Sequence, residues 1–128
     1  IGDLITDISG SSAYFLGSAV TYSDNAKQRL LGVHATTLAA HGAVSATTAA
    51  EMAQGARQIY GADIAASVTG IAGPTGATPG KPVGLVYIHL SAEGAEWGER
   101  HQWDADRIGN KVLAAEAVFR LLLRYLSG

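Results

Sequence analysis

The stretch with the clearest chemical character is an apolar run that ends abruptly in glycines. Residues 64–69 are apolar or small, and Gly70, Gly73 and Gly76 follow at intervals of three. Glycine lacks Cβ, so its backbone adopts positive φ values and a ligand can approach its N–H groups. Successive N–H groups turned the same way form a concavity that favours an anion, often a phosphate. The pattern predicts an anion-binding loop, and a tight connection between strands without a ligand is the alternative.

This loop matches neither of two common nucleotide-binding motifs. Its glycines follow the spacing G-x-x-G-x-x-G, whereas the dinucleotide motif is G-x-G-x-x-G and opens a helix. Gly80 and Lys81 are followed by Pro82, so the Ser or Thr that ends a Walker A motif is absent. Any nucleotide bound here is therefore held by a different loop geometry.

A tyrosine and a lysine offer acid–base chemistry in the first third of the chain. Tyr22 ends residues 15–22, whose aromatic and β-branched side chains predict a strand. Lys27 follows five residues later, in a short helix that Ser23 is expected to cap. A lysine desolvated beside a pocket has a lowered pKa and can activate a hydroxyl nucleophile, whereas an ordinary solvated helix lysine is the alternative. Because such loops gather at strand ends, we expect Tyr22, Lys27 and the glycine loop to face one pocket.

The histidines and cysteines give no sign of a metal site. His34, His41, His89 and His101 lack ligand spacing, and the chain contains no cysteine, so we predict no metal site. Arg107 opens the last predicted helix, where the helix dipole disfavours a cation. An anionic ligand at that helix end would explain its position.

The remaining pattern predicts an α/β fold. A single-domain three-layer α/β/α sandwich with a mixed parallel/antiparallel sheet is expected, because helical and strand-like segments alternate and one short link forms a hairpin. Strands are predicted over residues 15–22, 64–69, 85–90 and 96–103, and helices over residues 24–31, 46–60 and 106–126, with a single turn around Leu38. The buried stripe of the last helix is predicted to be Ile108, Val112, Ala115, Phe119, Leu122 and Leu126.

Composition narrows the class of protein. The chain has 128 residues, of which 48% are hydrophobic and 16% charged, as expected of one packed domain. Its net charge of −2 argues against a nucleic-acid partner. No apolar run approaches the roughly 20 residues of a membrane span. We therefore expect a cytoplasmic protein without nucleic-acid or membrane partners.

Six sequence blocks resemble the C-terminal domain of the CinA family, in the family's order and over nearly the whole chain. They are residues 6–15, 20–27, 31–33, 41–45, 68–74 and 81–84. That domain is known as nicotinamide-nucleotide amidase, which hydrolyses nicotinamide mononucleotide to nicotinate mononucleotide and ammonia in pyridine-nucleotide salvage. The resemblance implies this activity, a small nucleotide as substrate, no cofactor and a homodimer.

The resemblance also assigns roles to individual residues. It implies a serine nucleophile activated by Lys27, with Tyr22 as the second catalytic residue. The substrate-binding residues that it implies are Thr69, Gly70, Ile71, Ala72, Gly73, Ser12 and Arg107.

The family's serine stands in the motif Glu-Ser-Cys-Thr-Gly-Gly, which does not occur among the 128 residues. By the resemblance it would lie just upstream of Ile1. We expect residues 1–128 to be an amidase domain whose N-terminal part is missing. The alternative is a catalytically inert domain that binds a pyridine nucleotide or dimerises.

Overall fold

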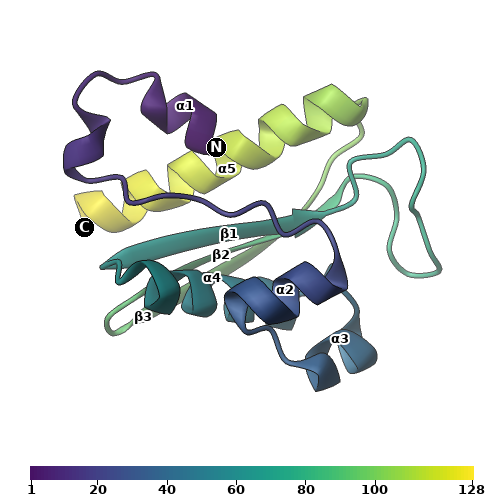
Figure 1. Cartoon of the computed structure of the whole chain (residues 1–128). Coiled ribbons are helices and arrows are strands. Elements are labelled where there is room, and N and C mark those ends of the chain that lie inside the picture. The colour runs from purple at the N-terminus through teal and green to yellow at the C-terminus, as the bar shows by residue number, and fades with distance from the viewer.

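A computed structural model describes residues 1–128 and shows a three-stranded sheet with helices on both faces (Figure 1). The sheet order is β1-β2-β3, and both neighbouring pairs are antiparallel. The strands are β1 (Ile64–Gly70), β2 (Leu85–Ala92) and β3 (Ala95–Gln102); the helices are α1 (Gly2–Thr6), α2 (Asp24–Leu31), α3 (Ala35–His41), α4 (Ala46–Tyr60) and α5 (Arg107–Ser127), with a 3₁₀ turn η1 (Ser11–Ala13). No helix combines the length and the apolar character that crossing a bilayer requires.

The two faces of the sheet contact different helices, because successive side chains of a strand point to opposite faces. One face packs against α5 in the main core, whose buried members are Val86, Ile88, Leu90, Ala92, Ala114, Ala117, Val118 and Leu121. On the other face, Ser67 donates a hydrogen bond to the Ala49 carbonyl of α4 at 2.6 Å. A second core lies between α2, α3 and α4 and consists of Leu31, Val33, Leu38 and Met52. The helices α2 and α3 thus reach the sheet through α4.

Most predicted elements are confirmed to within about two residues, because their end signals are local. Ser23 caps α2, Ser45 caps α4 and Asp106 caps α5; each side chain accepts a hydrogen bond from the backbone N–H three residues on. Gly32 and Gly61 end α2 and α4 with φ values of 70° and 59°. The hairpin of β2 and β3 is also confirmed.

The predicted strand over residues 15–22 is wrong, and so is the mixed sheet. Residues 16–22 make no backbone–backbone hydrogen bond, and Figure 1 shows this segment as plain coil between η1 and α2. Leu16, Val20 and Tyr22 are exposed. β-propensity describes a side chain's fit to a sheet, but a strand also needs a neighbour for its N–H and C=O groups. The segment is extended without such a neighbour, so the three-stranded sheet is wholly antiparallel.

The predicted buried stripe of α5 is also wrong. Ile108, Val112 and Leu126 are more than half exposed. The helix carries apolar residues on two faces, and the sheet contacts the face rich in alanine, because small side chains allow close approach. Buried on α5 are Asn110, Ala114, Ala117, Val118 and Leu121.

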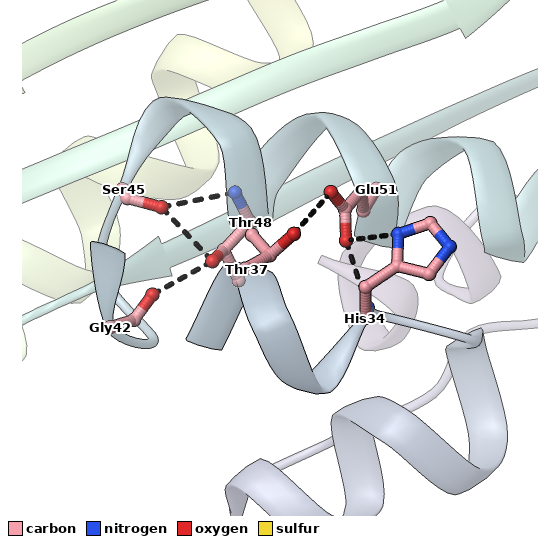
Figure 2. A network of polar contacts seen from close by, with 6 residues as sticks. All are labelled: His34, Thr37, Gly42, Ser45, Thr48 and Glu51. Carbon is pink, nitrogen blue, oxygen red and sulfur yellow. Dashed lines mark hydrogen bonds and ion pairs between the residues drawn. The ribbon is translucent and has the colours of Figure 1, made fainter. Parts of the chain in front are cut away.

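A polar network joins α3 to α4 through Glu51 (Figure 2). The Glu51 carboxylate accepts hydrogen bonds from the His34 backbone N–H at 2.9 Å and the Thr37 hydroxyl at 2.7 Å, and lies 3.1 Å from His34 Nδ1. Burial by itself raises the pKa of Glu51, but these hydrogen bonds and the His34 ring outweigh it and lower the pKa below its ordinary value. At the other end of α3, the Thr48 hydroxyl donates to the Gly42 carbonyl at 2.8 Å.

We expect Glu51→Gln to remove a stabilisation that depends on pH. Because the folded pKa is depressed, the contribution of Glu51 is present above its unfolded-state pKa of about 4.3 and is lost as the pH falls through the folded value. At neutral pH the variant should be less stable by about 1–2 kcal/mol, and this difference should shrink towards zero on acidification. Urea unfolding of both proteins across this pH range measures it. Glu116→Gln on the exposed side of α5 is the control; a gap for Glu51→Gln that does not change with pH would contradict the assignment.

We expect Gly55→Ala to destabilise the protein, although alanine favours helices. Gly55 lies where α4 contacts α2, and a Cβ atom there would overlap the Leu31 carbonyl oxygen. Overpacking typically costs about 1–3 kcal/mol, and because the Cβ atom would meet rigid backbone we expect the upper part of this range, above the roughly 1 kcal/mol gained in helix propensity. Chemical denaturation followed by circular dichroism gives the free energy of unfolding. Thr47→Ala, at an exposed position of the same helix, should be neutral or stabilising; a stabilising Gly55→Ala would show that the helices have room to separate.

Candidate functional site

Arg107 joins two predicted site residues that lie far apart in the sequence. Its Nη1 donates a hydrogen bond to the Gly73 carbonyl oxygen at 2.9 Å, and its Nη2 lies 3.2 Å from the Tyr22 hydroxyl oxygen. Arg107 is the first residue of α5, which Asp106 caps. The Tyr22 side chain is 84% exposed. The structure therefore brings an aromatic ring, a cation and the glycine loop together at one surface.

Lys27 is buried, so it is not an ordinary solvated helix lysine. It is 6% exposed, and its Nζ donates a hydrogen bond to the Thr21 carbonyl oxygen at 2.8 Å. Burial lowers the pKa of the Lys27 amine, and the charge of Asp24 offsets part of this effect. Since Thr21 precedes Tyr22 in the chain, the amine is anchored one residue from the tyrosine that contacts Arg107. The Thr21 hydroxyl is itself buried without a hydrogen-bond partner.

The glycine loop is held closely by its surroundings. At Gly70, a Cβ atom would lie 2.6 Å from Val86 Cγ2 and 2.8 Å from the Leu85 carbonyl oxygen. Gly73 has a φ of 86°, which disfavours side chains. Both glycines are thus needed for the connection between β1 and β2.

Carbonyl groups of the loop point to the start of α5. Asn110 Nδ2 donates to the Ala72 carbonyl oxygen at 3.0 Å, next to the contact that Arg107 makes with Gly73. The N–H groups of Ala72 and Gly73 donate no hydrogen bond. A hollow of about 450 Å³ lies at this junction and is lined by Ala72, Pro74, Val83, Ala105, Asp106, Arg107 and Ile108.

Asn110 was missed by the sequence reasoning. It follows Arg107 by three residues, a spacing that places both side chains on neighbouring positions of a helix surface. The sequence carries no clear signal for it, because Asn110 lies between Gly109 and Lys111 in the polar first turns of the helix.

The other predicted substrate residues are placed differently. The Thr69 side chain is buried and donates to the Ala43 carbonyl oxygen at 2.7 Å, so it fastens β1 to the segment before α4. Ile71 continues from β1 by donating its N–H to the Leu85 carbonyl oxygen at 2.9 Å. Ser12 is exposed in η1, at the opposite end of the molecule from the loop between β1 and β2 (Figure 1). The structure does not bring Ser12 together with the other site residues.

The titratable side chains do not gather into a metal site. No group of three or more His, Cys, Asp or Glu side chains is placed to hold a metal ion. His89 contacts Glu96 at 2.8 Å and His101 contacts Glu99 at 2.9 Å. These pairs join neighbouring strand positions and lie outside the cluster around Arg107.

The fold and this cluster define an α/β domain in which the loop after the first strand is clamped to the last helix. The family model of the CinA C-terminal domain matches residues 1–126. The chain belongs to this family, as the sequence blocks predicted.

Known relatives agree with this assignment. A CinA-like protein of Salinibacter ruber is 46% identical over 127 residues, which are 99% of this chain and 31% of the relative. A CinA-like protein of Citrifermentans bemidjiense is 51% identical over 122 residues, which are 95% of this chain and 30% of the relative. The chain therefore spans about a third of the length of these relatives.

Solved structures show the same fold. The competence damage-inducible protein A of Klebsiella pneumoniae superimposes with a TM-score of 0.93 at 33% identity, over 98% of this chain and 78% of that one. The competence/damage inducible protein CihA of Agrobacterium tumefaciens gives a TM-score of 0.91 at 38% identity, over 96% of this chain and 78% of that one.

We expect Arg107→Met to loosen the glycine loop. The substitution keeps the aliphatic stem but removes one of the two side-chain hydrogen bonds that α5 makes to the loop. A net loss of about 1.4 kcal/mol corresponds to roughly tenfold faster local opening. Hydrogen exchange at the Ile71 and Gly84 amides, which bond across the loop, reports this opening.

Two variants separate this effect from a general loss of stability. Tyr22→Phe removes only the contact between the hydroxyl and Arg107, so exchange at the two amides should stay as in the wild type. Arg120→Met removes a cation from an exposed position of α5 and should also have no effect. Unchanged exchange in Arg107→Met would show that Asn110 and packing hold the loop alone.

Proposed function

We propose that this chain is the substrate-binding and base-supplying part of a nicotinamide-nucleotide amidase, which converts nicotinamide mononucleotide to nicotinate mononucleotide and ammonia. The observation that carries the proposal is the buried Lys27 amine, which donates a hydrogen bond to the Thr21 carbonyl. The next residue, Tyr22, contacts Arg107, and Arg107 binds the Gly73 carbonyl of the glycine loop. Family membership supports the reaction class, and the geometry of Lys27 and Arg107 supports the roles proposed for them.

Lys27 has the properties of a general base. A lysine takes a proton only in its neutral form, and burial favours that form by lowering the pKa of the amine. Its hydrogen bond to the Thr21 carbonyl fixes the nitrogen in place. The buried, unpartnered hydroxyl of Thr21 lies next to this anchor. Unsatisfied buried polar groups cost about 1–3 kcal/mol and are worth examining as parts of functional sites.

The cluster around Arg107 suits the nucleotide. A guanidinium group recognises phosphate oxygens through several parallel donors. Ala72 lines the hollow and its N–H donates no hydrogen bond, so it is a further donor for an anionic oxygen. The exposed Tyr22 ring adds an aromatic surface and a hydroxyl at the same place.

The reaction that follows is acyl transfer through a serine of the family's Glu-Ser-Cys-Thr-Gly-Gly motif. Lys27 removes the serine proton, and the serine oxygen attacks the carboxamide carbon. Backbone N–H groups stabilise the oxyanion, and the protonated base returns its proton to the departing ammonia. Water, activated by the same amine, then hydrolyses the acyl-enzyme to the nicotinate product. The 128 residues themselves do not contain the motif.

We expect Lys27→Met to abolish most turnover while leaving the fold intact, because methionine fills the space of the lysine stem without a titratable group. Ammonia release from nicotinamide mononucleotide is measured on protein in which the serine motif precedes residue 1. Loss of a general base should lower kcat by about 10²–10⁴-fold. In the wild type, kcat/KM should rise as the pH passes the lowered pKa of Lys27, and the variant should lack this rise.

The matched control is Arg29→Met, which removes an exposed cation from the same helix and should retain both the rate and its pH dependence. Wild-type turnover in Lys27→Met would remove the amine from the mechanism. Calorimetric titration separates the amidase from the second candidate, a nucleotide-binding domain without turnover. Binding of the nucleotide without ammonia release from the motif-containing protein would establish that candidate instead.

A further inference from the structure

We propose that the open edge of β1 is a docking site for one extended segment, which pairs with β1 on one side and with residues 16–22 on the other. The segment that we assign to this site is the stretch leading into the serine motif of the amidase. Its identity rests on the proposed function, whereas the docking site follows from the backbone of residues 1–128.

One edge of β1 has no partner. It is the first strand in the order β1-β2-β3, so only β2 pairs with it. Ile71 donates its N–H to the Leu85 carbonyl oxygen, and bonded positions alternate along an antiparallel pair. The N–H and C=O groups of Ala66 and Val68 therefore point away from β2, where no other backbone group bonds to them. Such a row of free donors and acceptors is a template for another strand.

The composition of β1 is typical of a strand inside a sheet. Edge strands that face solvent usually carry charges or proline, which prevent further pairing. The opposite edge of this sheet is β3, which contains Glu96, Glu99, Arg100 and His101. Residues 64–70 of β1 contain neither a charged residue nor a proline. Because β1 is also covered by helices on both faces, we expect it to have a neighbour on each side.

Residues 16–22 provide a second unpaired row of backbone groups. They make no backbone–backbone hydrogen bond, and their large apolar side chains are exposed. Gly17 packs against the Tyr60 ring shortly before β1 begins, and Tyr22 contacts the arginine that binds Gly73 just beyond the end of β1. The segment thus follows β1 from its start to its end (Figure 1). Since no hydrogen bond joins the two rows, one strand between them would satisfy both.

The stretch before the serine motif is suited to this place. A strand that runs in the same direction as β1 would bring the residues after it to the cluster around Arg107, next to the segment whose carbonyl anchors the Lys27 amine. Ile1, which the motif precedes by the resemblance, lines a hollow together with Ile108, the residue after Arg107. The chain also covers only 78% of the Klebsiella and Agrobacterium structures, so those proteins contain further residues.

The neighbours of the docking site predict the side chains of the segment. Ile64, Ala66 and Val68 pack against the core next to α5, whereas Ser67 and Thr69 bond to carbonyls in α4 or just before it. Side chains at matching positions of neighbouring strands share one face of the sheet. The segment should therefore alternate between apolar residues that face α5 and small or hydroxyl residues that face α4.

The test measures hydrogen exchange of the purified chain with a synthetic peptide. In the peptide, alternating valine and threonine residues, seven in all as in β1, precede Glu-Ser-Cys-Thr-Gly-Gly. At about ten times its Kd, the peptide should slow exchange of the Ala66 and Val68 amides about tenfold, because only the peptide-free fraction exchanges. Alternate amides of residues 16–22 should slow to the same extent.

Two controls isolate backbone pairing from other contacts. A peptide with the same side chains but with N-methyl groups on alternate strand amides lacks the donors of one edge, so it should give no protection. The Arg100 amide of β3 also points away from β2, because Trp103 donates its N–H to the Gly84 carbonyl oxygen. Exchange at Arg100 should be the same with either peptide as without one.

The possible results distinguish the docking site from the proposed function. If the peptide leaves the β1 amides unprotected while the motif-containing protein releases ammonia, the docking site is overturned and the proposed function stands. If the peptide protects them but neither this complex nor the motif-containing protein releases ammonia, the docking site stands and the proposed function is contradicted. Protection confined to β1 would remove residues 16–22 from the site. Protection without peptide that is lost on dilution would place a second copy on the edge and overturn the proposal.

Discussion

The contact between the first turns of α5 and the loop after β1 holds the candidate site together. Arg107 and Asn110, three residues apart on one helix, each bind the carbonyl of a consecutive loop residue. The helix dipole disfavours a cation at the N-terminus of a helix. Here the Arg107 guanidinium donates hydrogen bonds to the Gly73 carbonyl oxygen and the Tyr22 hydroxyl. Loop, helix and the segment around Tyr22 would otherwise be three independent surfaces.

The helices and the sheet pack closely because small residues lie where their backbones approach one another. The α4 helix approaches the sheet through its alanines. Two hydroxyls of β1 bond to this region: Ser67 donates to the Ala49 carbonyl of α4, and Thr69 donates to the Ala43 carbonyl just before α4. Gly55 lets α2 rest against α4, and this in turn places the buried Lys27 at the end of the segment that carries Tyr22. Small residues therefore determine how closely α2, which carries Lys27, packs against α4.

Sequence reasoning succeeded where the signals are local. The caps Ser23 and Asp106 and the short link before β3 define helix starts and a hairpin without reference to the rest of the chain. It failed where the outcome depends on a partner. Residues 15–22 have the composition of a strand, but pairing is decided by what lies beside them. The α5 helix has two apolar faces with helical spacing, so periodicity could not tell which one meets the sheet. Of the candidate site, the sequence predicts Lys27 and the glycine loop as candidates, whereas the burial of the amine and the hydrogen bonds of Asn110 depend on tertiary contacts.

The segment leading to Tyr22 has a consequence for the basicity of the site. Lys27 is anchored by one hydrogen bond, and its acceptor belongs to a stretch whose other backbone groups have no partner in the protein. Stretches with few internal hydrogen bonds open at low free energy. Each opening readmits water around the ammonium group and raises its proton affinity. The protonation of this lysine thus reports local order: whatever stiffens residues 16–22 keeps the amine desolvated and increases the fraction of it that is neutral at a given pH.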